Sequence, residues 1–186
     1  MWMRWLMGVG LTVALMLAGC QSPGGKPDLV AAAQIDRDVD ASLRNLFDRV
    51  PTARMLAKQA KGILVFPNVV KAGFIGGAHY GKGALRKQDR TAGYYNLVAG
   101  SYGLQAGVQA FDYALFFMTT SALNYLDRSE GFELGVGPTV VVVDAGVAKS
   151  LSTTTLKDDV YAFIYDQKGL MAGLNIEGSK ITRITP

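Results

Sequence analysis

Hydrophobic positions near the start of the folded region recur with the period of a helix. Apolar residues return every three or four positions between residues 28 and 50, as on one helical face: Ala32, Ile35, Val39, Leu43, Leu46 and Val50. Asp28 is a suitable N-cap, and Pro51 is expected to end this helix at about Arg49. A second, short helix is predicted from Thr52 to Ala60, with Gly62 ending it.

After Gly62 the pattern becomes that of short strands interrupted by glycines. A third helix is predicted over 121–126, capped by Thr119 and Thr120, and a hairpin turn over Asp166–Gly169. Because no long helix separates the strands, we predict an α+β fold: a curved antiparallel β-barrel-like core with about three helices packed on its surface. The predicted strands cover 63–66, 69–85, 93–99, 103–109, 114–118, 132–136, 139–143, 159–165, 170–176 and 180–184.

The first 27 residues have the pattern of an exported, lipidated protein. A short apolar run, Leu6 to Leu17, follows the positive charge of Arg4, as in a secretory signal, and it is shorter than the ~20 residues that span a membrane. It ends in Leu-Ala-Gly-Cys, which resembles the bacterial lipobox and implies acylation of Cys20, the only cysteine. We therefore expect residues 1–19 to be a signal peptide, 20–27 a lipidated tether, and 28–186 the folded domain.

The tether sets how far the domain can lie from a membrane. Gln21 to Pro27 contains two prolines and two glycines, and seven extended residues reach at most roughly 25 Å. The domain is therefore expected beside the bilayer. Gln21 stands where Gram-negative sorting typically uses Asp to retain a lipoprotein in the inner membrane. This resemblance implies a bacterial cell envelope protein anchored in the outer membrane.

Charge is unevenly distributed along the chain. The formal net charge is +4, which becomes +3 without Arg4, yet the segment from Arg49 to Arg90 holds nine bases and one acid, Asp89. The segment from Asp112 to Glu177 holds nine acids and four bases. The positive pole therefore lies in the first half of the domain.

The histidine and cysteine side chains that enzymes often use for catalysis or metal binding are nearly absent from the sequence, so we do not expect an enzyme. His79 is the only histidine, the only thiol is assigned to the lipid anchor, and no His/Cys cluster has metal-binding spacing. The sequence therefore predicts no catalytic residues, no metal and no cofactor. The hydroxyl-rich run 150–155 could cradle a phosphate, but a solvated loop is the favoured interpretation. A basic patch on an exported protein is also poorly placed for nucleic acid.

The basic segment is the better indication of function. Near a membrane such a cluster attracts anionic headgroups by ~1 kcal/mol for each cation close to the surface, although it could equally be a solubilising face. His79 beside it could be a pH switch or a partly buried strand histidine. The expected headgroup ligands lie in or beside a glycine-rich hairpin: Lys71, Lys82, Arg86, Lys87 and Arg90.

Three stretches together resemble the SYLF domain family, in its bacterial lipoprotein branch. They are Ala60–Pro67 running into Lys71–Phe74, then Glu133–Pro138, and finally Lys168–Gly173 followed by Glu177–Ser179. Their order and spacing cover roughly residues 28 to 186. The resemblance implies a β-barrel-like core with packed helices, and binding of phosphoinositides or other anionic lipids, with actin binding in some eukaryotic members.

This chain departs from the family pattern in ways that move the expected site. Eukaryotic members use a basic amphipathic N-terminal segment on membranes, whereas the first helix here carries Asp36, Asp38, Asp40 and Asp48. Its apolar stripe is therefore expected to pack on the core. We predict a membrane-anchored lipoprotein that weakly binds anionic lipid headgroups, such as phosphoinositides, on the basic hairpin. The alternative is an envelope structural or protein-interaction module without lipid specificity.

Overall fold

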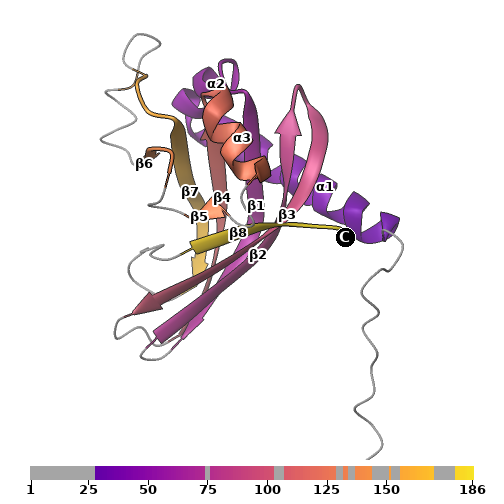
Figure 1. Ribbon diagram of the computed structural model, residues 1–186. Coiled ribbons are helices and arrows are strands. Elements are labelled where there is room, and N and C mark those ends of the chain that lie inside the picture. The colour runs from indigo at the N-terminus through magenta and orange to yellow at the C-terminus, as the bar shows by residue number, and fades with distance from the viewer. Residues whose placement is uncertain are drawn as a thin grey trace, which may run out of the picture.

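The computed structural model describes residues 28–73, 76–102, 107–128, 132–133, 137–143, 151, 156–169 and 179–186. The predicted signal peptide, Cys20, the tether, and the strand over 170–176 lie outside these residues. The described chain forms three helices and eight strands (Figure 1): α1 Leu29–Arg49, α2 Pro51–Ala57, β1 Gly62–Gly73, β2 Gly76–Lys87, β3 Arg90–Tyr102, β4 Gly107–Phe117, α3 Thr120–Arg128, β5 Phe132–Glu133, β6 Val140–Val142, β7 Val160–Gly169 and β8 Ser179–Ile184.

The strands form one curved sheet, which confirms the predicted α+β class. Their order is β5-β8-β3-β2-β1-β4-β7-β6, so β5 and β6 stand at the two ends of the order and the sheet makes only half of a barrel. All neighbours are antiparallel except β6 and β7, which are parallel. The predicted strand 69–85 is divided between β1 and β2, β3 is longer than predicted, and β4 runs unbroken from within the predicted strand 103–109 into the predicted strand 114–118.

Helices cover both faces of this sheet. On one face α1 and α2 pack against Val65, Ala84 and Phe116, and on the other face α3 packs against Leu64, Leu85 and Phe117. Phe116 and Phe117 are adjacent on β4 and both are fully buried. Both rings are buried because each face of the strand has its own helix layer.

The first helix forms as its sequence predicts. The side chain of Asp28 accepts hydrogen bonds from the backbone N–H groups of Val30 and Ala31, at 3.0 and 3.1 Å. Ile35, Val39 and Leu46 are buried against the sheet, as expected from the apolar stripe. The backbone N–H of Asp28 also donates to the carbonyl of Pro186 at 2.6 Å, so the start of α1 is tied to the residues after β8.

At two irregular sites the strands continue past the ends that the sequence pattern predicts. β1 continues through Pro67, which sits in a bulge where the missing N–H costs no ladder bond, and Asn68 there has a positive φ of 54°. The predicted turn over Asp166–Gly169 is wrong, because β7 continues to Gly169 past a second irregularity. Asp166, with φ of 51°, takes the left-handed conformation inside this strand.

A buried polar network joins α1 to both irregular sites. The hydroxyl of Ser42 donates to Asp112 Oδ2 at 2.6 Å and lies 2.6 Å from the hydroxyl of Tyr165. The other carboxylate oxygen of Asp112 accepts the backbone N–H of Asn68 at 2.9 Å. This network fixes the middle of α1 over β4 and β7.

None of the helices that the structure describes combines the length and hydropathy of a membrane-crossing segment.

Candidate functional site

The five predicted headgroup ligands do not form one cluster. Lys71 is on β1 opposite His79, and Lys82 is exposed on β2 opposite Asn96. The remaining three, Arg86, Lys87 and Arg90, lie at the turn between β2 and β3. The structure therefore brings together only the three residues that are also close in sequence.

Lys71 is buried, which contradicts its assignment to an exposed site. Its side chain is 0% exposed on the sheet face that carries α3, and it is flanked in register by Gln109 of β4 and His79 of β2. Burial lowers the pKa of Lys71. Burial, together with the charge of Lys71, lowers the pKa of His79, whose ring also contacts Phe111 edge-on at 6.0 Å between centroids. His79 is thus a buried strand histidine.

Arg86 is also engaged within the fold. Its guanidinium donates to Asp40 Oδ1 at 2.6 Å and to the carbonyl of Asp36 at 3.1 Å, and it lies 3.4 Å from Asp36 Oδ1. It also bonds to the hydroxyl of Thr91. Only 12% of its side chain is exposed. Arg86 therefore fastens the hairpin to α1, and its charge is matched by two carboxylates.

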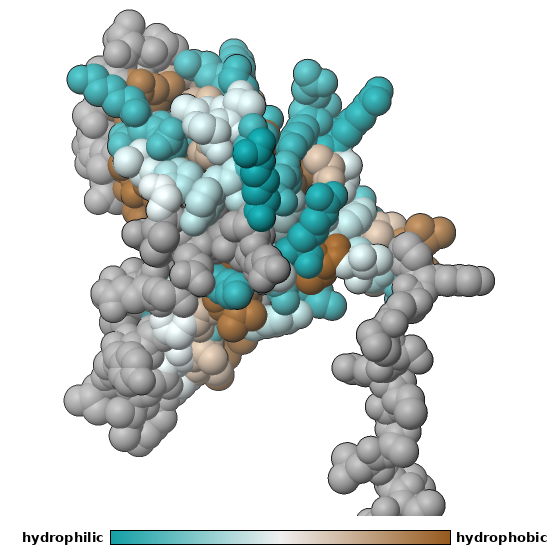
Figure 2. Space-filling model, in the orientation of Figure 1, coloured by the Kyte–Doolittle hydropathy of each residue, from teal (hydrophilic) through white to brown (hydrophobic). Residues whose placement is uncertain are grey.

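The turn that follows Arg86 presents the more accessible cations. Gln88 and Asp89 have φ of 50° and 61°, and Lys87 pairs with Arg90, which together make a two-residue type I′ turn. Lys87 lies 3.3 Å from Asp127 of α3, with 36% of its side chain exposed. Arg90 is exposed. Figure 2 shows long hydrophilic side chains gathered over this end of the sheet.

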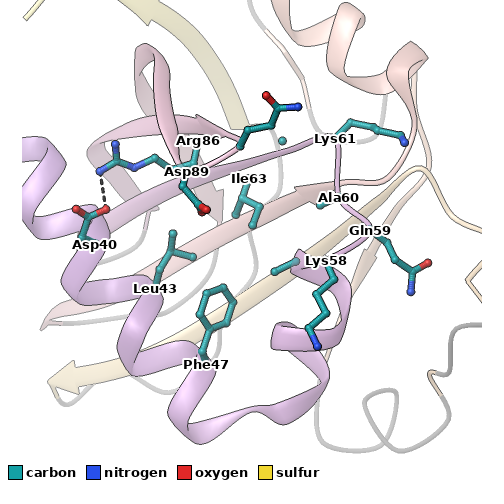
Figure 3. Close-up of a pocket in the computed structure, with 13 residues that line it drawn as sticks. Asp40, Leu43, Phe47, Lys58, Gln59, Ala60, Lys61, Ile63, Arg86 and Asp89 are labelled. Carbon is teal, nitrogen blue, oxygen red and sulfur yellow. Dashed lines mark hydrogen bonds and ion pairs between the residues drawn. The ribbon is translucent and has the colours of Figure 1, made fainter.

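A groove of about 520 Å³ lies between this turn and the two N-terminal helices. Figure 3 shows apolar side chains of Leu43, Phe47 and Ile63 along its floor, and the charged side chains around them. Asp40, joined to Arg86, stands on one side, and Lys58 and Lys61 on the other. The arrangement offers an apolar surface bordered by cations, with Asp89 of the turn also among its lining residues.

Lys58 and Lys61 are the site residues that the sequence interpretation passed over. Both belong to the basic segment, but they precede the glycine-rich hairpin and were not grouped with it. They reach the groove because β1 begins directly after Lys61 and pairs Ile63 with Arg86. The backbone N–H of Lys61 also donates to the carbonyl of Phe117 at 2.7 Å, which fixes this corner.

A comparison with known families identifies part of this fold. Residues 98–185 match the Ysc84 family model, described as "Las17-binding protein actin regulator". The C-terminal part of the chain thus carries a Ysc84 (SYLF) domain match. The matched range begins within β3, so α1, α2, β1, β2 and the groove between them precede it. No curated protein matches the chain significantly.

Proposed function

We propose that the whole of residues 28–186 is a SYLF domain of the bacterial lipoprotein branch, anchored through Cys20 in the outer membrane, and that it binds anionic lipid headgroups. The groove beside the β2–β3 turn carries this proposal. It combines an apolar floor with exposed cations on its border, as a phospholipid headgroup and its glycerol region require. We propose a binding protein and not an enzyme.

The cations proposed to contact headgroup phosphates are Lys58 and Lys61, which line the groove, and Arg90 of the adjacent turn. An exposed Lys or Arg gives charge-assisted hydrogen bonds to phosphate oxygens, and Arg can make two in parallel. Lys71 is excluded by its burial, and Arg86 and Lys87 by their carboxylate partners, Asp36 and Asp40 for Arg86 and Asp127 for Lys87. Because the contacts lie in an open groove, we expect a dissociation constant on the order of 10⁻⁵–10⁻³ M.

The groove lies close enough to the proposed anchor for both to contact the same membrane. α1 rises about 1.5 Å per residue, so Leu43 lies roughly 20 Å from the first residue of the helix. A tether from Cys20 to Pro27 extends at most roughly 25 Å. The groove can therefore meet the membrane in which the chain is proposed to be anchored, and Asp40 of α1, which lines the groove, is paired there with Arg86.

Vesicle flotation tests this proposal. A chain that begins at Gln21 lacks the anchor and keeps every contact described above. It should float with vesicles of 30% phosphatidylinositol phosphate, not with neutral phosphatidylcholine vesicles, and should be released at 1 M salt, where charges are screened within about 3 Å. Replacing Lys58, Lys61 and Arg90 with Ser should abolish flotation.

The matched control removes the same charge elsewhere. Lys157, Lys168 and Lys180 are exposed outside the groove, and their replacement with Ser should leave flotation close to the parent level. Equal losses in both triple variants would indicate a response to net charge and would contradict the groove assignment.

A protein-interaction function is the second candidate. The matched family is described by binding to the protein Las17 and by actin regulation, which supports a protein partner for a domain of this kind. Flotation that is indifferent to vesicle charge would favour this candidate. The anchor is tested separately: metabolic labelling with a palmitate analogue should mark the parent chain and not the Cys20→Ala variant.

A further inference from the structure

One end of the sheet carries an exposed apolar surface on the same side as α1. Figure 1 shows β1 to β4 extending beyond the helices at this end. Four large apolar side chains there are exposed by 40–63%: Val70, Tyr80, Val98 and Val108. We call this surface the bare face, and it also includes Ala72, Ala78, Gly100 and Ala110.

The strand register makes the bare face continuous. Val70 pairs with Tyr80 and with Ala110, and Tyr80 pairs with Val98, so one row crosses four strands. A second row joins Val108, Ala72, Ala78 and Gly100. Contiguous apolar surface of this kind marks an interaction site more often than single exposed residues do.

The helix α1 stands above the sheet beside the bare face, so the surface drops by one step from the helix to the bare strands. Ser42 is fixed over Asp112 and Tyr165, and Arg49 lies 3.6 Å from Asp166, so the helix crosses β4 and β7 just above the apolar rows. A helix with its side chains is about 10–12 Å thick. The bare strands therefore lie about one layer below the outer surface of α1.

We propose that the bare face is a homodimer interface, covered by the bare face of a second copy of this chain. Two sheets stack about 10 Å apart, which matches the depth of the step, so the second sheet would continue the layer that α1 begins. A flat bilayer would rest on α1 and would not reach the recessed strands. The step thus favours a second sheet over a membrane, and the proposal does not depend on headgroup binding.

The available area fits a weak dimer. One partly exposed Tyr and three Val residues, with the small residues between them, offer roughly 400–500 Å² per copy. Two copies would bury on the order of 1,000 Å², near the lower limit for a specific interface. We therefore expect a dissociation constant on the order of 10⁻⁶–10⁻⁴ M.

Charges around the bare face are complementary between two copies. Lys82, Lys168 and Lys180 border it, because they share the strand face of Tyr80, Ala110 and Val98. Asn45 and Arg49 both reach Asp166, so they mark the flank of α1 that faces the bare strands. Asp38 lies on the same flank, two helical turns before Asn45. Asp166 pairs with both Arg49 and Lys168 of its own chain, so Lys82 and Lys180 are the cations that would approach Asp38 of a second copy.

Sedimentation velocity tests the dimer. The chain that begins at Gln21, without lipid or detergent, should shift from monomer to dimer between about 1 and 500 µM. Val98→Glu places two like charges in the dimer and should raise the dissociation constant at least about tenfold. Val142→Glu is the matched control, since Val142 is 53% exposed on β6, outside the bare face, and should leave dimerisation unchanged.

Each alternative outcome overturns the proposal. A chain that stays monomeric at about 500 µM has no such interface. A dimer that responds equally to both variants, or to neither, uses another surface. Vesicle binding by a monomeric parent that is lost only in Val98→Glu would make the bare face a membrane contact instead. Unchanged circular dichroism and thermal unfolding in both variants exclude a folding defect.

Discussion

Gly83 should be the least replaceable of the strand glycines that the structure describes around β1. A Cβ added at this position would lie 2.0 Å from the carbonyl oxygen of Val65 and 2.8 Å from Phe66 Cδ1, whereas real Cβ contacts stay beyond 3.0 Å. The neighbour is backbone in the bulged part of β1, so no side-chain rotation relieves the overlap. The two strands would have to separate by about 1 Å.

Gly83→Ala should therefore cost about 3 kcal/mol, the upper part of the range for an overpacked core. For a domain of this size that lowers the melting temperature by roughly 6–12 °C. Thermal unfolding followed by circular dichroism measures the shift. Gly100→Ala is the control: it adds the same methyl group to the paired strand β3, where a Cβ meets nothing within 4 Å. A similar melting temperature in the two variants would refute the close approach of β1 and β2.

Three further predictions concern Arg86, the type I′ turn and His79. Arg86→Met should destabilise the domain by about 2–3 kcal/mol in urea unfolding, because it leaves Asp36 and Asp40 without their cation at a site where only 12% of the arginine is exposed. Arg54→Met is the control: it breaks an exposed ion pair with Asp48 and should cost less than about 1 kcal/mol. Asp89→Gly should stabilise the domain by about 0.5–1 kcal/mol, because glycine accepts the positive φ, and a loss of stability would contradict the turn assignment. Because the pKa of His79 is lowered in the fold, the unfolded chain binds the proton at a higher pH than the folded chain does. The free energy of unfolding should therefore fall as pH drops below about 6.5 and level off below the folded-state pKa. His79→Gln should reduce this dependence of stability on pH, and an unchanged dependence would place its origin in other groups.

Local features of the sequence were sufficient for the helices and the fold class. The stripe from Ile35 to Leu46 and the cap at Asp28 act within a few residues of each other, so they are visible without tertiary information. Strand ends were harder to predict, because Pro67 and Asp166 have the local character of turns and yet lie within strands. Their irregular geometry is supported by pairing with β4, which is distant in sequence.

The site depended on contacts that no local pattern reveals. A charged residue in a glycine-rich hairpin is normally exposed, but Lys71 continues the buried alternation of Val69 and lies between Gln109 and His79. Arg86 meets Asp36 and Asp40 across 50 and 46 sequence positions. A triple replacement of Arg86, Lys87 and Arg90 would therefore test folding as much as binding.

Under the proposed anchoring through Cys20, the hydrogen bond between Asp28 and Pro186 has a mechanical consequence. Tension from a membrane anchor would enter the domain at the first residue of α1, where Leu29 and Val30 are 78% and 77% exposed and contribute little packing. A helix pulled from its end detaches turn by turn, so this bond and the Asp28 cap would yield before the buried residues Ile35 and Val39 are loaded. The first turn of α1 would then act as a compliant extension of the tether, while the sheet and the groove keep their shape.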